Sequence, residues 1–150
     1  MGCHCILVPV DGSESSSKAA AYAMELAQSC EAEINFLHVV DLQNSLANPL
    51  LAEVPRKDAS VLEDVIDRGK RILDTLLEQV PLAINARGHC VSSSSPVEAI
   101  LQEARDIGCD LIVMGSRGLG PWRAVLVGSV SRAVLEAAKC PVLLVKADKK

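Results

Sequence analysis

The chain has 150 residues, only three of them aromatic, and a formal net charge of −4. This charge argues against a nucleic-acid partner or a membrane-surface role, because both need a basic face. No apolar run reaches the roughly 18 residues of a membrane-spanning helix, and the length fits one domain over residues 1–150.

The first residues contain neither the basic region nor the cleavage site of a signal peptide. We therefore expect a cytoplasmic protein whose six cysteines are reduced thiols. Cys3, His4 and Cys5 are adjacent, and we interpret them as the start of a strand. A soft-metal site or a mixed disulfide is the alternative, although three residues cannot close a tetrahedral zinc site alone.

Short β-branched apolar runs alternate with helical periodicity along the chain. Residues 5–10 predict a strand buried on both faces, residues 14–30 a helix with Ser13 as its N-cap, and residues 33–40 a second strand. Residues 41–57 are polar and irregular, and predict a long connection. The elements predicted after it are a helix at 58–79, a strand at 84–91, a helix at 96–107, a strand at 110–114, a helix at 129–138 and a strand at 141–146.

This strict alternation predicts an α/β fold in which helices cover both faces of a parallel sheet. Right-handed crossovers reduce the topologies to an open, twisted, doubly wound sheet of five strands, Rossmann-like, for which the usual strand order is 3-2-1-4-5. Such sheets bind ligands at the carboxyl ends of their strands. The segments expected there are 9–13, 39–41, 92–95 and 115–129.

The segment from Gly115 to Ser129 has the features of a phosphate-binding loop. Its glycines allow close approach to an anion, and the helix that begins at Ser129 offers free N–H groups and a partial positive charge. Ser131 adds a hydroxyl and Arg117 a charged donor. The bland alternative is a set of turn glycines with Ser129 as an ordinary N-cap. The loop lacks both the Walker A pattern and the dinucleotide fingerprint.

Four segments in order resemble the universal stress protein family. The loop has the spacing Gly115-x2-Gly118-x9-Gly128-Ser129 of that family's ATP-binding signature. The other three segments are the first strand and turn at residues 6–13, the second strand at 37–40 and the last strand at 140–145. The similarity covers essentially the whole chain, and it departs from the family mainly at residues 121–123, which include Trp122.

The resemblance implies an adenine-nucleotide site for ATP, ADP or AMP, with Mg²⁺ or Mn²⁺ bridging phosphate oxygens. Asp11 would hold the ribose or the adenine edge, although an Asp before Gly-Ser is also a common turn residue. Val39 would pack on the base. The full set of implied site residues is Pro9, Val10, Asp11, Val39, Met114, Gly115, Arg117, Gly118, Gly128, Ser129, Val130 and Ser131.

The resemblance also implies a homodimer through the last strand, an apolar edge that invites pairing. The alternative is a covered edge within a monomer. The strand residues concerned are Val142, Leu143, Leu144 and Val145.

We expect a nucleotide-dependent regulatory protein of the stress response. No paired carboxylate, His–Asp pair or evident base lies in the loop segments, which argues against dedicated catalysis. The alternatives are a slow ATPase or nucleotide hydrolase and a nucleotide-free dimeric scaffold.

Overall fold

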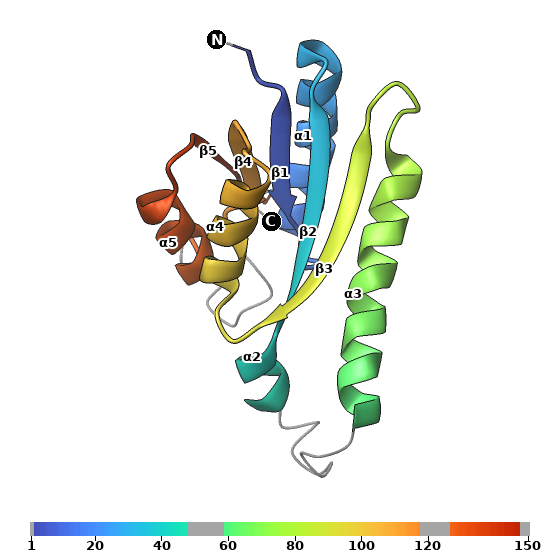
Figure 1. Ribbon diagram of the computed structural model, residues 1–150, viewed down its shortest axis with the longest axis vertical. Helices are drawn as coiled ribbons and strands as arrows, with labels where there is room; N and C mark the ends of the chain where they lie inside the picture. Colours follow the sequence, from blue (N-terminus) through green and yellow to red (C-terminus); the bar gives the residue numbers. More distant parts are fainter. Residues whose placement is uncertain (1, 48–58, 118–126, 148–150) are drawn as a thin grey trace.

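The five strands form one parallel sheet in the order β3-β2-β1-β4-β5, as predicted (Figure 1). The computed structural model describes residues 2–47, 59–117 and 127–147. The strands are β1 (Cys5–Pro9), β2 (Glu33–Asp41), β3 (Ala86–Ser93), β4 (Leu111–Gly115) and β5 (Val142–Val145). Because β1 lies between β2 and β4, the chain reverses its winding direction at β1.

Helices cover both faces of this sheet, α1 and α3 on one side and α4 and α5 on the other (Figure 1). The helices are α1 (Glu14–Cys30), α2 (Leu42–Ala47), α3 (Ala59–Gln79), α4 (Pro96–Asp106) and α5 (Ser129–Ala137). Among the described residues, none of these helices combines the length and the apolar character that crossing a membrane requires.

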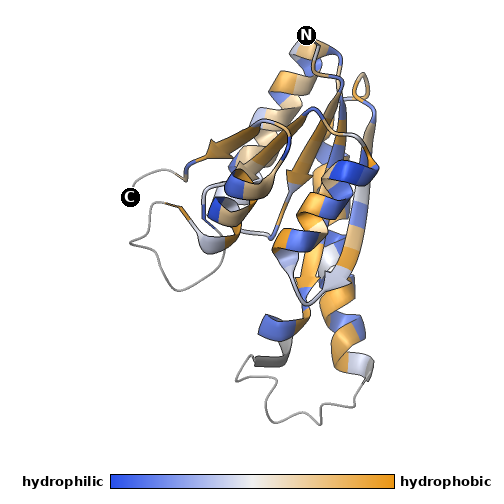
Figure 2. Ribbon diagram, turned by 60° about the vertical axis from the view of Figure 1, so that its left-hand side comes forward, coloured by the Kyte–Doolittle hydropathy of each residue, from blue (hydrophilic) through white to orange (hydrophobic). Residues whose placement is uncertain are grey.

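The core has two layers because side chains of a strand alternate between the faces of the sheet. In β1, Ile6 and Val8 pack in the layer under α1 and α3, whereas Cys5 and Leu7 pack in the layer under α4 and α5. This burial on both sides explains the continuous apolar run of β1. Figure 2 shows the strands as a mostly apolar layer, beside helices that mix apolar and polar residues.

Two local predictions differ from the structure. The connection predicted at 41–57 contains α2, which Asp41 caps by accepting hydrogen bonds from the N–H groups of Gln43 (3.0 Å) and Asn44 (3.2 Å). The third strand begins at Ala86, two residues later than predicted, because Ile84 donates its N–H to the carbonyl of Pro81 in a turn (2.9 Å). Ile84 is apolar because it packs in the core, with 9% of its surface exposed, and not because it pairs.

Candidate functional site

Hydrogen bonds join the two ends of the loop that follows β4, and we call these two ends, residues 115–116 and 128–131, the neck of the loop. Gly128, the N-cap of α5, donates its N–H to the carbonyl of Ser116 (2.6 Å), and the Ser131 hydroxyl donates to the carbonyl of Gly115 (2.8 Å). The N-terminus of α5 therefore sits directly at the carboxyl end of β4. Of the predicted loop residues, Gly118 and Trp122 lie outside the described residues.

The Ser131 side chain stabilises the neck, because its hydroxyl donates its single proton to the carbonyl of Gly115. Its side chain is buried, with 4% of the residue exposed. The hydroxyl proton of Ser131 is therefore used in a bond to the end of β4. Ser129, the first residue of α5, and Val130 follow Gly128 in the same turn.

A second helix N-terminus meets β4 at Gly115. A Cβ placed on Gly115 would lie 2.8 Å from the carbonyl carbon of Ser15 and 2.8 Å from the nitrogen of Ser16, closer than real Cβ atoms approach. The Ser15 hydroxyl donates to the carbonyl of Arg117, and the Arg117 N–H donates back to Ser15 Oγ (3.4 Å). The N-termini of α1 and α5 thus flank one strand end, and each carries a partial positive charge.

The turn after β1 is built around Asp11. Its carboxylate accepts a hydrogen bond from the Ser13 N–H (2.9 Å), and its own N–H donates to Ser16 Oγ (3.3 Å). Gly12 follows with a φ of +83°, the left-handed region that glycine adopts without strain. Ser13 then caps α1 by accepting from the Ser16 N–H. The turn role that the sequence allowed for Asp11 is therefore present, and the half-exposed carboxylate stays at the strand end.

The backbone of Val10 is satisfied within the protein. Its N–H donates to the carbonyl of Leu37 (2.8 Å), and its carbonyl accepts from Nδ1–H of His38 (2.8 Å). His38 is thus a structural histidine that joins β2 to the end of β1. The Val10 side chain packs in the layer under α1 and α3, 4% exposed, while Pro9 ends β1 beside it.

An apolar wall lies on the other face of the same sheet edge. Met114, near the end of β4, is buried there with 5% exposure, and Val39 of β2 and Val130 of α5 pack against the same layer. The structure therefore brings three of the predicted apolar residues together on the face covered by α4 and α5. Val10 faces the opposite layer.

Sequence reasoning missed three serines that build this site. Ser15, Ser16 and Ser116 are at most 5% exposed, and each hydrogen bonds across the gap between β1, β4 and the helix starts. The available signal was the polar run 13–17 at the start of an otherwise alanine-rich helix. Polar side chains that a helix buries usually bond to backbone, so such a run indicates a close approach of another segment.

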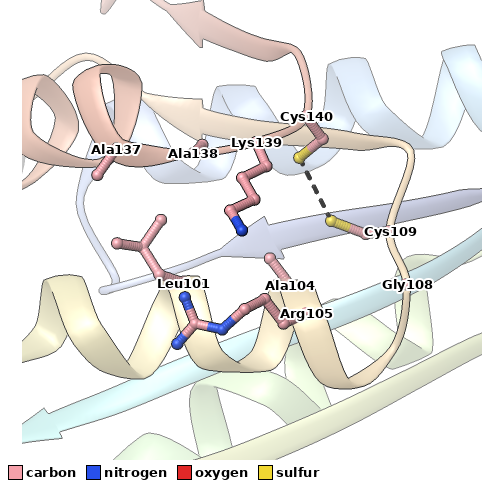
Figure 3. Close-up of a pocket in the computed structure, with 9 residues that line it drawn as sticks. All are labelled: Leu101, Ala104, Arg105, Gly108, Cys109, Ala137, Ala138, Lys139 and Cys140. Atoms are coloured by element: carbon pink, nitrogen blue, oxygen red, sulfur yellow. Dashed lines mark hydrogen bonds between the residues drawn. The ribbon is translucent and has the colours of Figure 1, made fainter.

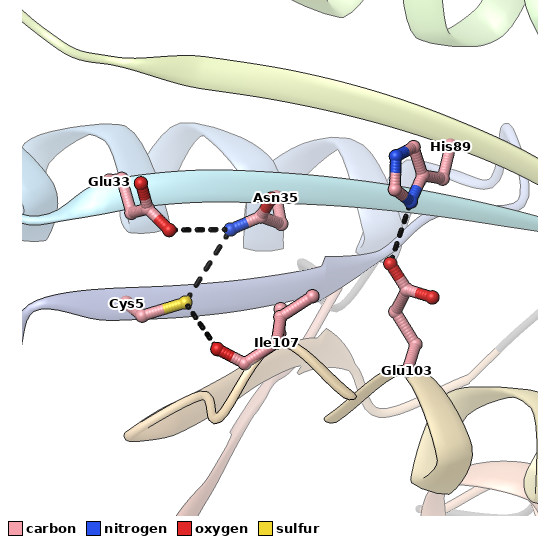
Figure 4. Close-up of polar contacts among 6 residues, drawn as sticks. All are labelled: Cys5, Glu33, Asn35, His89, Glu103 and Ile107. Carbon is pink, nitrogen blue, oxygen red and sulfur yellow. Dashed lines mark hydrogen bonds and ion pairs between the residues drawn. The ribbon is translucent and has the colours of Figure 1, made fainter. Parts of the chain in front are cut away.

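Figure 4 shows two other groups of polar contacts, one around Cys5 of β1 and one between His89 of β3 and Glu103 of α4. Cys5 is the first residue of β1, Asn35 Nδ2 donates to its Sγ (3.5 Å), and burial raises the pKa of its thiol to about 11. His89 pairs with Glu103 (2.7 Å) on the surface. Within the described residues, no three His, Cys, Asp or Glu side chains are grouped to hold a metal ion.

Comparison with known proteins agrees with this architecture. A model of the universal stress protein family matches residues 4–146. The chain is 32% identical over 146 residues to the universal stress protein YxiE of Bacillus subtilis, which covers 94% of this chain and 97% of that protein. The hypothetical protein MJ0577 of Methanocaldococcus jannaschii superposes with a TM-score of 0.84 over 100% of both chains, at 24% identity.

A second solved structure is a universal stress protein in complex with cAMP. It is 26% identical to this chain, has a TM-score of 0.63 and covers 99% of this chain and 100% of its own. Because the family model spans nearly the whole sequence, this chain belongs to the universal stress protein family.

Proposed function

We propose that the chain is a homodimeric, nucleotide-dependent regulatory protein that binds ATP at the carboxyl ends of β1 and β4. The observation that carries this proposal is the pair of helix N-termini at the carboxyl end of β4. The N-terminus of α5 is held there by the hydrogen bond from Gly128 to Ser116 (2.6 Å), and that of α1 by the contacts of Ser15 with Gly115 and Arg117. The segment from Gly115 to Ser129, whose two ends lie at these positive helix ends, suits a polyphosphate, because a helix N-terminus attracts an anion.

The remaining contacts divide the site into two parts. The apolar wall of Val39 and Met114 suits a flat base, and Asp11 beside it suits a ribose hydroxyl, for which a carboxylate is a good acceptor. On the phosphate side we assign Gly115, Arg117, Gly118, Gly128, Ser129, Val130 and Ser131. The cAMP complex of a 26% identical relative supports an adenine nucleotide. Mg²⁺ or Mn²⁺ would bridge phosphate oxygens and keep water ligands, so it needs no protein cage.

The open side of β5 supports the homodimer. It is the edge strand of the sheet, and its four residues, Val142 to Val145, are all only half-buried within one chain. An apolar edge strand with unpaired backbone groups is a template for pairing with a second copy.

The deciding experiment is mass spectrometry of the nucleotide that co-purifies, followed by melting with and without ATP and Mg²⁺. ATP at about 1,000 times its Kd should stabilise the native state by about 4 kcal/mol. Gly128→Asp puts a negative charge at the N-cap of α5 and should abolish this shift, whereas Gly2→Asp makes the same change at the other end of the sheet and should preserve it. The proposal would be contradicted if the purified chain carried no nucleotide and millimolar ATP left its Tm unchanged.

A further inference from the structure

Two thiols meet at the end of the sheet opposite the loop neck. Sγ of Cys109 and Sγ of Cys140 are 3.7 Å apart, and Figure 3 shows them facing each other across the starts of β4 and β5. They border a cavity of about 200 Å³ between the C-terminal ends of α4 and α5. Lys139 and Arg105 also line this cavity, so the thiols share it with two cations.

The backbone fixes this meeting of the two sulfur atoms. Gly108, with a φ of +60°, ends the turn after α4, and Cys109 donates its N–H to the carbonyl of Ala104 (3.1 Å). Pro141, which follows Cys140, accepts a hydrogen bond from the N–H of Ile112 in β4 (3.0 Å). Each cysteine therefore lies two residues before one of two neighbouring strands whose register is set.

The two thiols differ in exposure. Cys109 is 9% exposed, and burial, reinforced by the neighbouring Cys140, raises the pKa of its thiol. Cys140 is more exposed and follows Lys139, whose charge favours anions in the cavity. A reagent that enters from solvent consequently meets Cys140 first, with Cys109 protonated behind it.

We propose that Cys109 and Cys140 are a peroxide-oxidised thiol pair that closes to a reversible intramolecular disulfide. The Cys140 thiol releases its proton, the thiolate attacks one oxygen of hydrogen peroxide, the O–O bond breaks, and the leaving hydroxide takes up the released proton to form water. Cys109 then attacks the sulfenic sulfur, the S–O bond breaks, and the second hydroxide leaves as water with the Cys109 proton. Two thiols lose two electrons and one peroxide is reduced to two waters.

The two sulfur atoms must approach each other for this step. A disulfide joins its sulfur atoms at about 2.0 Å, and the two Sγ atoms are 3.7 Å apart in the reduced chain. The bond would close a loop across a sequence separation of 31 that contains all of α5. Closing such a loop restricts the unfolded chain, so we expect the Tm of the oxidised form to rise by roughly 5–15 °C. A dithiol reductant restores the thiols by exchange.

The test treats the full, reduced chain with hydrogen peroxide, blocks remaining thiols by alkylation and maps peptides by mass spectrometry. We expect two of the six thiols to disappear, a mass lower by two hydrogens, and a peptide that links Cys109 to Cys140. The higher Tm should return to the reduced value after dithiothreitol. No nucleotide is added in any arm, and the readout is the thiol pair alone, so the result does not depend on the function proposed above.

Cys140→Ser should form no such link and show no rise in Tm on oxidation. Cys30→Ser, which removes an exposed cysteine at the end of α1, is the matched control and should behave as the unmodified chain does. Two outcomes overturn the proposal even if Cys140→Ser fails to fold. One is a disulfide mapped instead between Cys3 and Cys30 in the unmodified chain. The other is Cys140 oxidised to sulfinic acid with no link to Cys109.

Discussion

The hydroxyl of Ser131, in the first turn of α5, donates to the backbone carbonyl of Gly115 at the end of β4 across 2.8 Å. This bond joins two residues on opposite sides of the loop that the sequence singles out. It makes the loop neck a structural feature of the fold, in addition to any role in binding phosphate.

Ser131→Ala should lower the free energy of unfolding by about 1–3 kcal/mol, because it leaves the carbonyl of Gly115 without this donor in a buried position. Urea unfolding followed by circular dichroism measures the loss. Ser94→Ala, on the exposed surface after β3, is the control and should change stability by no more than about 0.5 kcal/mol. Equal losses for the two variants would show that the hydroxyl bond does not stabilise the neck.

Gly115→Ala should destabilise the protein by about 1–3 kcal/mol, because its Cβ would lie 2.8 Å from backbone atoms of Ser15 and Ser16. Gly88→Ala is a matched control, since Gly88 also lies in a strand but its Cβ would meet the flexible side chain of Leu77 at 3.2 Å. We expect the control to lose much less. Thermal melts of both variants compare them directly, and a Gly115→Ala variant as stable as Gly88→Ala would contradict this packing argument.

Element order and sheet topology were predictable from the sequence because they follow from local periodicity and from the handedness of crossovers. The neck of the loop was not, because the bond from Gly128 to Ser116 joins segments whose approach only the folded sheet determines. Gly115 shows how far the sequence alone can predict the site. The sequence indicated a glycine that admits phosphate, and the structure adds that Ser15 of α1 leaves no room for a side chain there.

Two further features, α2 and the contact between Cys109 and Cys140, were also not predicted from the sequence. Asp41 is the last residue of β2 and also the residue that caps α2. In the sequence it appears only as part of a polar segment, and a polar segment does not indicate a helix. Cys109 and Cys140 are far apart in the chain, so their contact depends on the pairing of β4 with β5.

Asp110 should contribute to the acid stability of the fold. The backbone N–H groups of His4 (2.7 Å) and Cys5 (2.9 Å) donate to its carboxylate and hold its pKa below the ordinary value of 3.8. A carboxylate with a lowered folded-state pKa stabilises the fold above the unfolded pKa, and this stabilisation is lost as pH falls through the folded value. Asp110→Asn should therefore reduce the dependence of Tm on pH below about pH 4.

The control for this titration is Glu136→Gln, which removes an exposed carboxylate of α5. Its Tm should follow the pH dependence of the unmodified chain. If Asp110→Asn and the unmodified chain showed the same decrease of Tm at acid pH, the two N–H bonds would not favour the ionised carboxylate.

Leu144→Pro should convert the proposed homodimer to a folded monomer. Pro141, the residue before β5, and Val145, the last residue of β5, accept hydrogen bonds from Ile112 and Ser116, so alternation along the strand directs the N–H of Leu144 to the open edge. Proline there removes a donor from the edge without breaking a bond to β4. Leu144→Ala keeps the N–H and should remain dimeric. Sedimentation velocity with circular dichroism distinguishes the two, and a Leu144→Pro dimer would place the interface elsewhere.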